Sequence, residues 1–120
     1  MPQTTTSSAP CGVSWFSAVC DDDYEFLGVP EPRLRSSWQH CRDIVLGAET
    51  GGFDRILLPS GYTLGLDTMA FAGGVAPLLR NIRLLTAIRC AELWPPQQAR
   101  QLATLDQMTE GRLDINIISS

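Results

Sequence analysis

The feature that most constrains the fold is a regular alternation of short apolar runs with segments of helical periodicity. The apolar runs, which predict β-strands, are residues 12–19, 55–59, 82–90 and 113–118. Helices are expected between them at residues 33–50, from Asp67 or Thr68 to Leu78, and from Pro95 to Gly111, with Ala99, Leu102, Leu105 and Met108 inward. The sequence therefore predicts a β-α-β-α-β-α-β order.

Strands joined through helices must run parallel, and a parallel sheet is usually covered on both faces. Two α/β architectures share this order, an open doubly wound sheet and a (β/α)8 barrel of the TIM type. A dinucleotide-binding sheet would carry a glycine-rich turn after its first strand, whereas residues 20–23 here read Cys-Asp-Asp-Asp, which would repel a pyrophosphate. We therefore expect residues 12–120 to form the first β-α-β-α-β-α-β portion of a TIM barrel.

Composition narrows the class of protein further. The nine basic residues are all arginine and are scattered along a chain of net charge −4, which disfavours nucleic-acid binding. No run approaches the roughly 20 apolar residues that a membrane helix needs. Residues 1–11 lack a secretory signal and are expected to be a disordered lead-in. The four cysteines have no C-x-x-C pairing and the single His40 adjoins Cys41, so we expect reduced thiols, no metal and a cytoplasmic location.

In a barrel, function gathers where the strands end and in the loops that follow. Here these places are residues 17–23, 59–63, 87–92 and 116–120, which offer hydroxyls, an amide and one arginine. Histidine and paired carboxylates suited to acid–base work are missing from them. This set suits a surface that holds a planar cofactor, and ordinary solvated loop ends are the alternative.

Three segments resemble the bacterial luciferase-like superfamily. Residues 95–119 (PPQQARQLATLDQMTEGRLDINIIS) resemble its "ATLDxxSxGR" helix and the following "xxNxVxG" strand. Residues 84–89 (LLTAIR) are similar to the third strand, especially in alkanesulfonate monooxygenases, and residues 52–61 to the second strand and its "PTG" turn. The resemblance covers roughly residues 12–119, in order.

This resemblance implies a barrel that uses reduced FMN, supplied by a flavin reductase, and O2 to oxygenate a small organic substrate, organosulfur compounds among the candidates. Family members often have a non-proline cis peptide beneath the flavin, matched here by Ala87–Ile88. Asn116 matches the amide that bonds the flavin ring, and Arg89 an arginine that could hold an anionic substrate or the flavin. Trp15 and Ser60 are the further candidates for substrate contact.

Several alternatives stay open at this stage. Asn116 could be a satisfied buried amide, Arg89 could pair with Glu92, and an Asp106–Arg112 pair could brace a helix end. Family members carry a functional cysteine or a His-His pair after the second strand, where this chain has Leu64 and Ser60-Gly61 respectively.

The sequence stops after the fourth strand, so we expect an N-terminal fragment whose catalytic residues lie beyond Ser120. A non-catalytic half barrel that binds flavin weakly or self-associates, a homo-oligomer and a deazaflavin-dependent oxidoreductase are further possibilities. A half barrel would have an unpaired strand at each edge of its sheet, and we therefore expect it to expose apolar surface.

Overall fold

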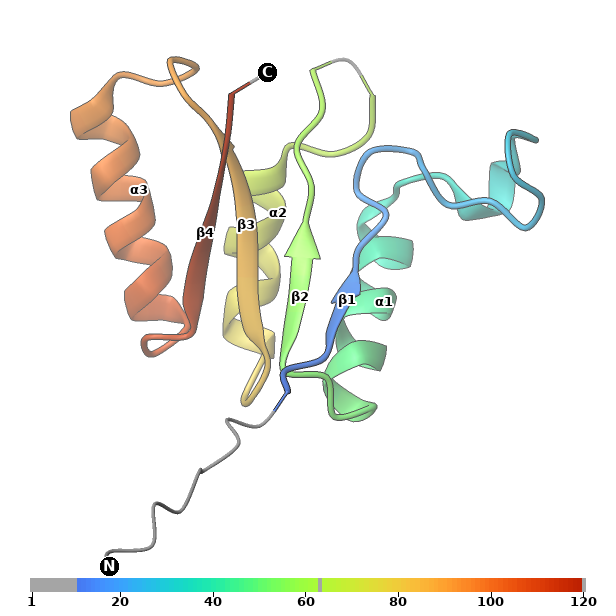
Figure 1. The fold of residues 1–120 in the computed structure, drawn as a ribbon, viewed down its shortest axis with the longest axis horizontal. Helices are drawn as coiled ribbons and strands as arrows, with labels where there is room; N and C mark the ends of the chain where they lie inside the picture. Colours follow the sequence, from blue (N-terminus) through green and yellow to red (C-terminus); the bar gives the residue numbers. More distant parts are fainter. Residues whose placement is uncertain (1–10, 63, 120) are drawn as a thin grey trace, which may run out of the picture.

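The computed structural model describes residues 11–62 and 64–119, which contain one four-stranded parallel sheet in the order β1-β2-β3-β4. The strands are β1 (Ser14–Phe16), β2 (Arg55–Leu58), β3 (Arg83–Arg89) and β4 (Leu113–Ile118). All four point their carboxyl ends toward the same edge (Figure 1). The predicted strand order is confirmed. Most of the expected lead-in, residues 1–10, lies outside the described residues.

Three helices connect the strands: α1 (Trp38–Thr50), α2 (Thr68–Val75) and α3 (Pro95–Met108). Asp67 caps α2 as predicted, through a 2.7 Å hydrogen bond from the Ala70 N–H to its carboxylate. The prediction that the first helix begins at Arg33 is wrong. A short 3₁₀ turn, η1 (Pro32–Leu34), stands there, and α1 begins only after Ser37, whose hydroxyl accepts from the His40 N–H.

The hydrophobic core lies between one face of the sheet and the helices. Ile56, Leu58 and Leu84 point to this face and are fully buried, because successive side chains of a strand alternate between faces. They pack against apolar side chains of α1 and α2, including Cys41, Val45, Phe71 and Val75. We call this side the helix face and the opposite side the open face.

A glycine explains how α1 and α2 approach each other. A Cβ on Gly74 would stand 2.7 Å from Cζ3 of Trp38, so only glycine leaves room for the indole ring, which also meets Phe71 edge-on. A second 3₁₀ turn, η2 (Ala76–Leu78), continues from α2 toward β3. Packing thus requires glycine at position 74, whereas a Cβ on Gly73 would meet nothing within 4 Å.

The third helix is less covered than its sequence predicts. Of the four positions expected to point inward, Leu105 is buried, Leu102 is half-buried, and Ala99 and Met108 are exposed, which corrects the expectation for the last two. The reason is that α3 joins β3 to the edge strand β4, beyond which the described residues provide no further helix to pack against.

Between β1 and α1 the chain makes a loop that is closed at its base. The Asp21 N–H donates to Ser36 Oγ and the Ser36 N–H donates to the Asp21 carboxylate, each over 2.7 Å. Beyond this pair, His40 Nε2 lies 2.7 Å from Asp23 Oδ2. We call residues 22–35 the stapled loop. No helix among residues 11–62 and 64–119 has the length and apolar character to cross a bilayer.

Candidate functional site

At the carboxyl edge of the sheet, Ala87 of β3 and Asn116 of β4 are register partners. Both side chains belong to the open face, since they alternate with the buried Thr86 and with Ile115. The Asn116 side chain is half-buried, and no residue of the described chain hydrogen-bonds its amide. A small side chain therefore lies beside a free donor–acceptor group on neighbouring strands.

Two residues further along β3, Arg89 reaches across to the turn that follows β2. Its Nη2 donates to the Ser60 carbonyl oxygen over 2.7 Å, and its guanidinium carbon lies 4.0 Å from the centre of the Tyr62 ring. Only 11% of the side chain is exposed, and Nε is buried without a hydrogen-bond partner among the described residues. The structure thus brings together Arg89 and Ser60, two residues singled out in the sequence.

The alternative in which Arg89 pairs with Glu92 is present in the structure, but only as a long ion pair. The closest approach, between Nε and Oε1, is 3.9 Å, which is too long for a hydrogen bond. Because the Glu92 side chain is 43% exposed, water weakens this pairing further. Arg89 Nε therefore keeps only a long ion pair to Glu92 and no hydrogen bond among the described residues.

Two further members of this cluster, Tyr62 and Cys20, lie in the strand-end segments predicted from the sequence, although neither was singled out there as a site residue. Cys20 Sγ lies only 3.3 Å from the point where a Cβ on Gly61 would stand, so the thiol fills the space beside the turn after β2. Partial burial, and then the nearby Asp22, raise the pKa of the Cys20 thiol, while Arg89 lowers it. The thiol form therefore dominates near neutral pH. No spacing rule links residue 20 to residue 61, and only the fold brings them together.

Two other predicted residues lie apart from this cluster. Trp15 is the register partner of Ile56 and therefore points to the helix face, where its ring meets Phe53 at 5.3 Å. The Ile88 side chain points to the helix face as well, so on the open face Ile88 contributes only its backbone, next to Ala87. The expected cis peptide at Ala87–Ile88 is absent, because every peptide bond in the described chain is trans. A trans bond is the cheaper form by roughly 3–4 kcal/mol.

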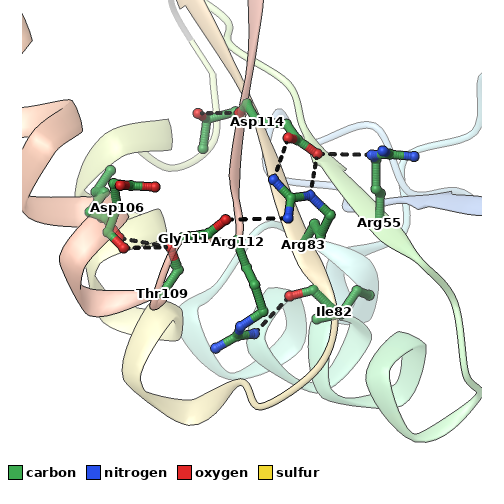
Figure 2. Close-up of polar contacts among 10 residues, drawn as sticks. Arg55, Ile82, Arg83, Asp106, Thr109, Gly111, Arg112 and Asp114 are labelled. Atoms are coloured by element: carbon green, nitrogen blue, oxygen red, sulfur yellow. Dashed lines mark hydrogen bonds and ion pairs between the residues drawn. The ribbon is translucent and has the colours of Figure 1, made fainter.

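The opposite, amino-terminal end of the open face carries a charged cluster (Figure 2). Asp114 accepts from Arg83 through both carboxylate oxygens, at 2.7 and 2.9 Å, and from Arg55 at 2.8 Å. The side-chain hydrogen bond from Arg83, followed by that from Arg55, lowers the pKa of Asp114 to about 2, against the opposing effect of its burial. We call Arg55, Arg83 and Asp114 the basal cluster.

The proposed brace between Asp106 and Arg112 takes a different form from the one expected. Arg112 donates to the carbonyl oxygens of Ile82 and Leu79, over 2.8 and 2.9 Å, and forms no ion pair with Asp106 (Figure 2). The Asp106 carbonyl instead accepts from the Gly111 N–H at the end of α3. Arg112 therefore braces the start of β4 against the start of β3.

Comparison with known folds defines the class of protein first. The crystal structure of riboflavin lyase with modified FMN and its substrate riboflavin superposes with a TM-score of 0.78 at 16% sequence identity, covering 91% of this chain and 30% of that one. EDTA monooxygenase from Chelativorans sp. BNC1 superposes with a TM-score of 0.71 at 17% identity, covering 90% and 29%. The four strands and three helices thus have the fold of part of a TIM barrel, as predicted.

Sequence comparison then gives the family. Residues 24–120 match the luciferase-like monooxygenase family, to which this chain belongs. The chain is 64% identical over 117 residues to the sulfoquinovose monooxygenase of Novosphingobium aromaticivorans, covering 92% of this chain and 32% of the relative. It is 52% identical over 120 residues to the sulfoquinovose monooxygenase of Agrobacterium fabrum, covering 100% and 31%. The chain therefore spans about a third of the length of these relatives.

Proposed function

We propose that this chain supplies the N-terminal part of a flavin-dependent monooxygenase that acts on a sulfonated sugar of the sulfoquinovose type. The observation that carries the proposal is the Arg89 cluster, a buried guanidinium with an unpartnered N–H at the functional edge of a luciferase-like barrel. The names of the two close relatives support the substrate class.

The open face fits a flavin ring at Ala87 and Asn116. The Asn116 amide has an unpartnered carbonyl and NH2 group, which match the mixed acceptors and donors on the edge of an isoalloxazine ring. Ala87 and the Ala87–Ile88 backbone beside it would form the floor. Reduced FMN, delivered by a separate flavin reductase, would supply the activation of O2. The chain's own residues orient the ring and shield it from water on one side.

For the substrate, Arg89 provides the anion-binding group. A sulfonate presents three oxygens that a planar guanidinium can bind through parallel N–H groups, which a lysine cannot reproduce. The Ser60 carbonyl occupies Nη2 and the Tyr62 ring lies over the guanidinium carbon, so the fork is held in one orientation before any ligand arrives. Pre-orientation of this kind lowers the entropy cost of binding.

Flavin binding is tested by titrating the purified chain with FMN and following flavin fluorescence. Asn116→Ala removes the ring-edge hydrogen bonds, so we expect the Kd for FMN to rise about tenfold, the effect of losing roughly 1.4 kcal/mol. Asn81→Ala, at an exposed position near the opposite end of β3, is the matched control and should leave Kd unchanged. Equal FMN affinities for Asn116→Ala and the parent would refute the flavin assignment. Tighter binding of a deazaflavin than of FMN would show that the cofactor is a deazaflavin.

Sulfonate specificity is tested in the Novosphingobium relative with its matched N-terminal region replaced by this chain. The reaction contains sulfoquinovose, FMN, O2 and a flavin reductase, and sulfite release is measured. Arg89→Met should raise KM for sulfoquinovose at least tenfold while leaving the Kd for FMN within a factor of two. Arg42→Met, in an ion pair on α1, is the control. An unchanged KM, or a loss confined to FMN affinity, would show that Arg89 does not hold the sulfonate.

A further inference from the structure

The aromatic residue Tyr62, in the turn that follows β2, is held in place although it is open to solvent. It is 68% exposed, yet its ring lies over the Arg89 guanidinium, whose carbon is 4.0 Å from the ring centre. Within the described chain, Tyr62 is the one aromatic ring that lies over a guanidinium. Because Arg89 covers one face of the ring and most of the residue is exposed, the other face is left to solvent.

The turn that carries Tyr62 is fixed on both sides at the carboxyl edge of the sheet (Figure 1). On one side, the Ser60 carbonyl oxygen accepts from the guanidinium over 2.7 Å. On the other side, the Leu66 N–H donates to the Val19 carbonyl oxygen over 2.8 Å. Gly65 lies against the same oxygen with a φ of 83°, and a Cβ there would collide with it, so only glycine permits this contact. Contacts on both sides therefore hold the turn beside the Arg89 cluster.

We propose that Tyr62 is a specificity-determining residue whose ring packs against the sugar ring of the substrate, so that the site prefers a sulfonated sugar to a small alkanesulfonate. This inference rests on the proposed function, in which Arg89 binds the sulfonate. In a sugar of the sulfoquinovose type, one methylene group separates the sulfur from the pyranose ring. A sulfonate on Arg89 therefore leaves the pyranose beside the residue that stacks on the guanidinium. The C–H groups of a pyranose pack well against an aromatic ring, whose face carries partial negative charge and whose contact removes apolar surface from water.

A role for Tyr62 that is confined to holding Arg89 makes a different prediction. The ring does help to orient the guanidinium, but the Ser60 carbonyl also fixes Nη2, and Glu92 lies 3.9 Å from Nε. If Tyr62 acted through Arg89 alone, its loss would weaken the binding of every sulfonate by the same factor. If its ring contacts the sugar, its loss weakens chiefly those sulfonates that carry a ring. The two roles are therefore separated by comparing substrates.

The experiment uses the Novosphingobium relative with its matched N-terminal region replaced by this chain, and compares sulfoquinovose with methanesulfonate, which carries no ring. Sulfite release gives KM for sulfoquinovose, and competition with that reaction gives Ki for methanesulfonate. Tyr62→Ala should raise KM for sulfoquinovose about tenfold and Ki for methanesulfonate at most about twofold. Tyr62→Phe keeps the ring and should leave both constants within about a factor of two. If Tyr62→Ala fails to fold, Tyr62→Leu takes its place with a smaller rise in KM.

Tyr24→Ala is the matched control, because Tyr24 is the other tyrosine of the chain, is also exposed, and hydrogen-bonds the Asp21 carbonyl oxygen. It should change neither constant, and circular dichroism checks that each variant folds. An unchanged KM for Tyr62→Ala, equal rises in KM and Ki, or a Tyr62→Phe variant as impaired as Tyr62→Ala would each overturn the contact between ring and sugar. Failure of methanesulfonate to inhibit the parent would overturn the sulfonate site itself, and this inference with it.

Discussion

Replacing Asp114 by asparagine is expected to lower the free energy of unfolding near neutral pH by roughly 1–2 kcal/mol. The pKa of this carboxyl falls from its ordinary 3.8 to about 2 in the folded chain, chiefly through the hydrogen bond from Arg83 and then that from Arg55. That difference corresponds to about 2.4 kcal/mol. Because 26% of the side chain is exposed, solvent screening reduces the expected effect.

The sign of the pH dependence follows from the lowered pKa. The stabilisation is fully present above the unfolded value of 3.8 and is lost as the pH falls toward about 2, where the folded carboxyl also takes up a proton. The parent should therefore be more stable than Asp114→Asn near neutral pH, and the two should converge in acid. Other acid-sensitive groups are common to both proteins, so the difference between them isolates Asp114.

Urea unfolding followed by circular dichroism, repeated from about pH 7 down to about pH 2.5, measures this difference. Asp43→Asn is the control, because Asp43 pairs with Arg42 in an exposed contact on α1 and should cost at most about 0.5 kcal/mol. A gap between parent and Asp114→Asn that keeps the same size at all pH values would refute the electrostatic explanation and would indicate a packing effect instead.

The same unfolding assay tests three further substitutions. Gly74→Ala should destabilise the chain by about 1–3 kcal/mol despite alanine's better helix propensity, because the new methyl group would stand 2.7 Å from Trp38. Gly47→Ala, where a Cβ meets nothing within 4 Å, should instead stabilise it by up to about 1 kcal/mol, so effects of equal sign would contradict the packing argument. Glu49→Gln should lower the free energy of unfolding by about 1 kcal/mol, because the Glu49 carboxylate accepts hydrogen bonds from three backbone N–H groups of residues 80–82. Burial alone would raise the pKa of this carboxyl, but the three hydrogen bonds hold it below its usual value. The difference in stability between the parent and Glu49→Gln should become smaller in acid. A difference that does not change with pH would refute the role given to the Glu49 charge.

The sheet could be predicted from the sequence because its strands are continuous apolar runs separated by helical periodicity. The start of α1 could not be predicted, because Leu34 fits the helical spacing although the residues around it form a separate turn. Pro32 opens a separate turn, and the backbone at Arg35 is extended with ψ of 146°, so the helix begins only at its Ser37 cap. Hydrophobic periodicity indicates which side chains are buried, but it does not indicate where the backbone leaves one turn and begins a helix.

The candidate site was predictable in part, for a related reason. Arg89 ends β3 and Asn116 lies two residues before the end of β4, and the barrel topology places the carboxyl ends of all strands at one edge. The face to which Trp15 points could not be inferred, because β1 is only three residues long and both Trp15 and Phe16 are apolar. The contact of Cys20 with Gly61 depends on the path of two loops, which no periodicity encodes.

The stapled loop has a consequence for how this protein can vary and be engineered. Because Asp21 and Ser36 bond each other directly, the ends of the loop stay fixed whatever lies between them. The entropy cost of lengthening such a loop grows only logarithmically, at about 0.6 kcal/mol for each doubling. Leu27, at its tip, is 97% exposed, so a peptide tag or a spectroscopic probe inserted there would report on the molecule while leaving the sheet in place.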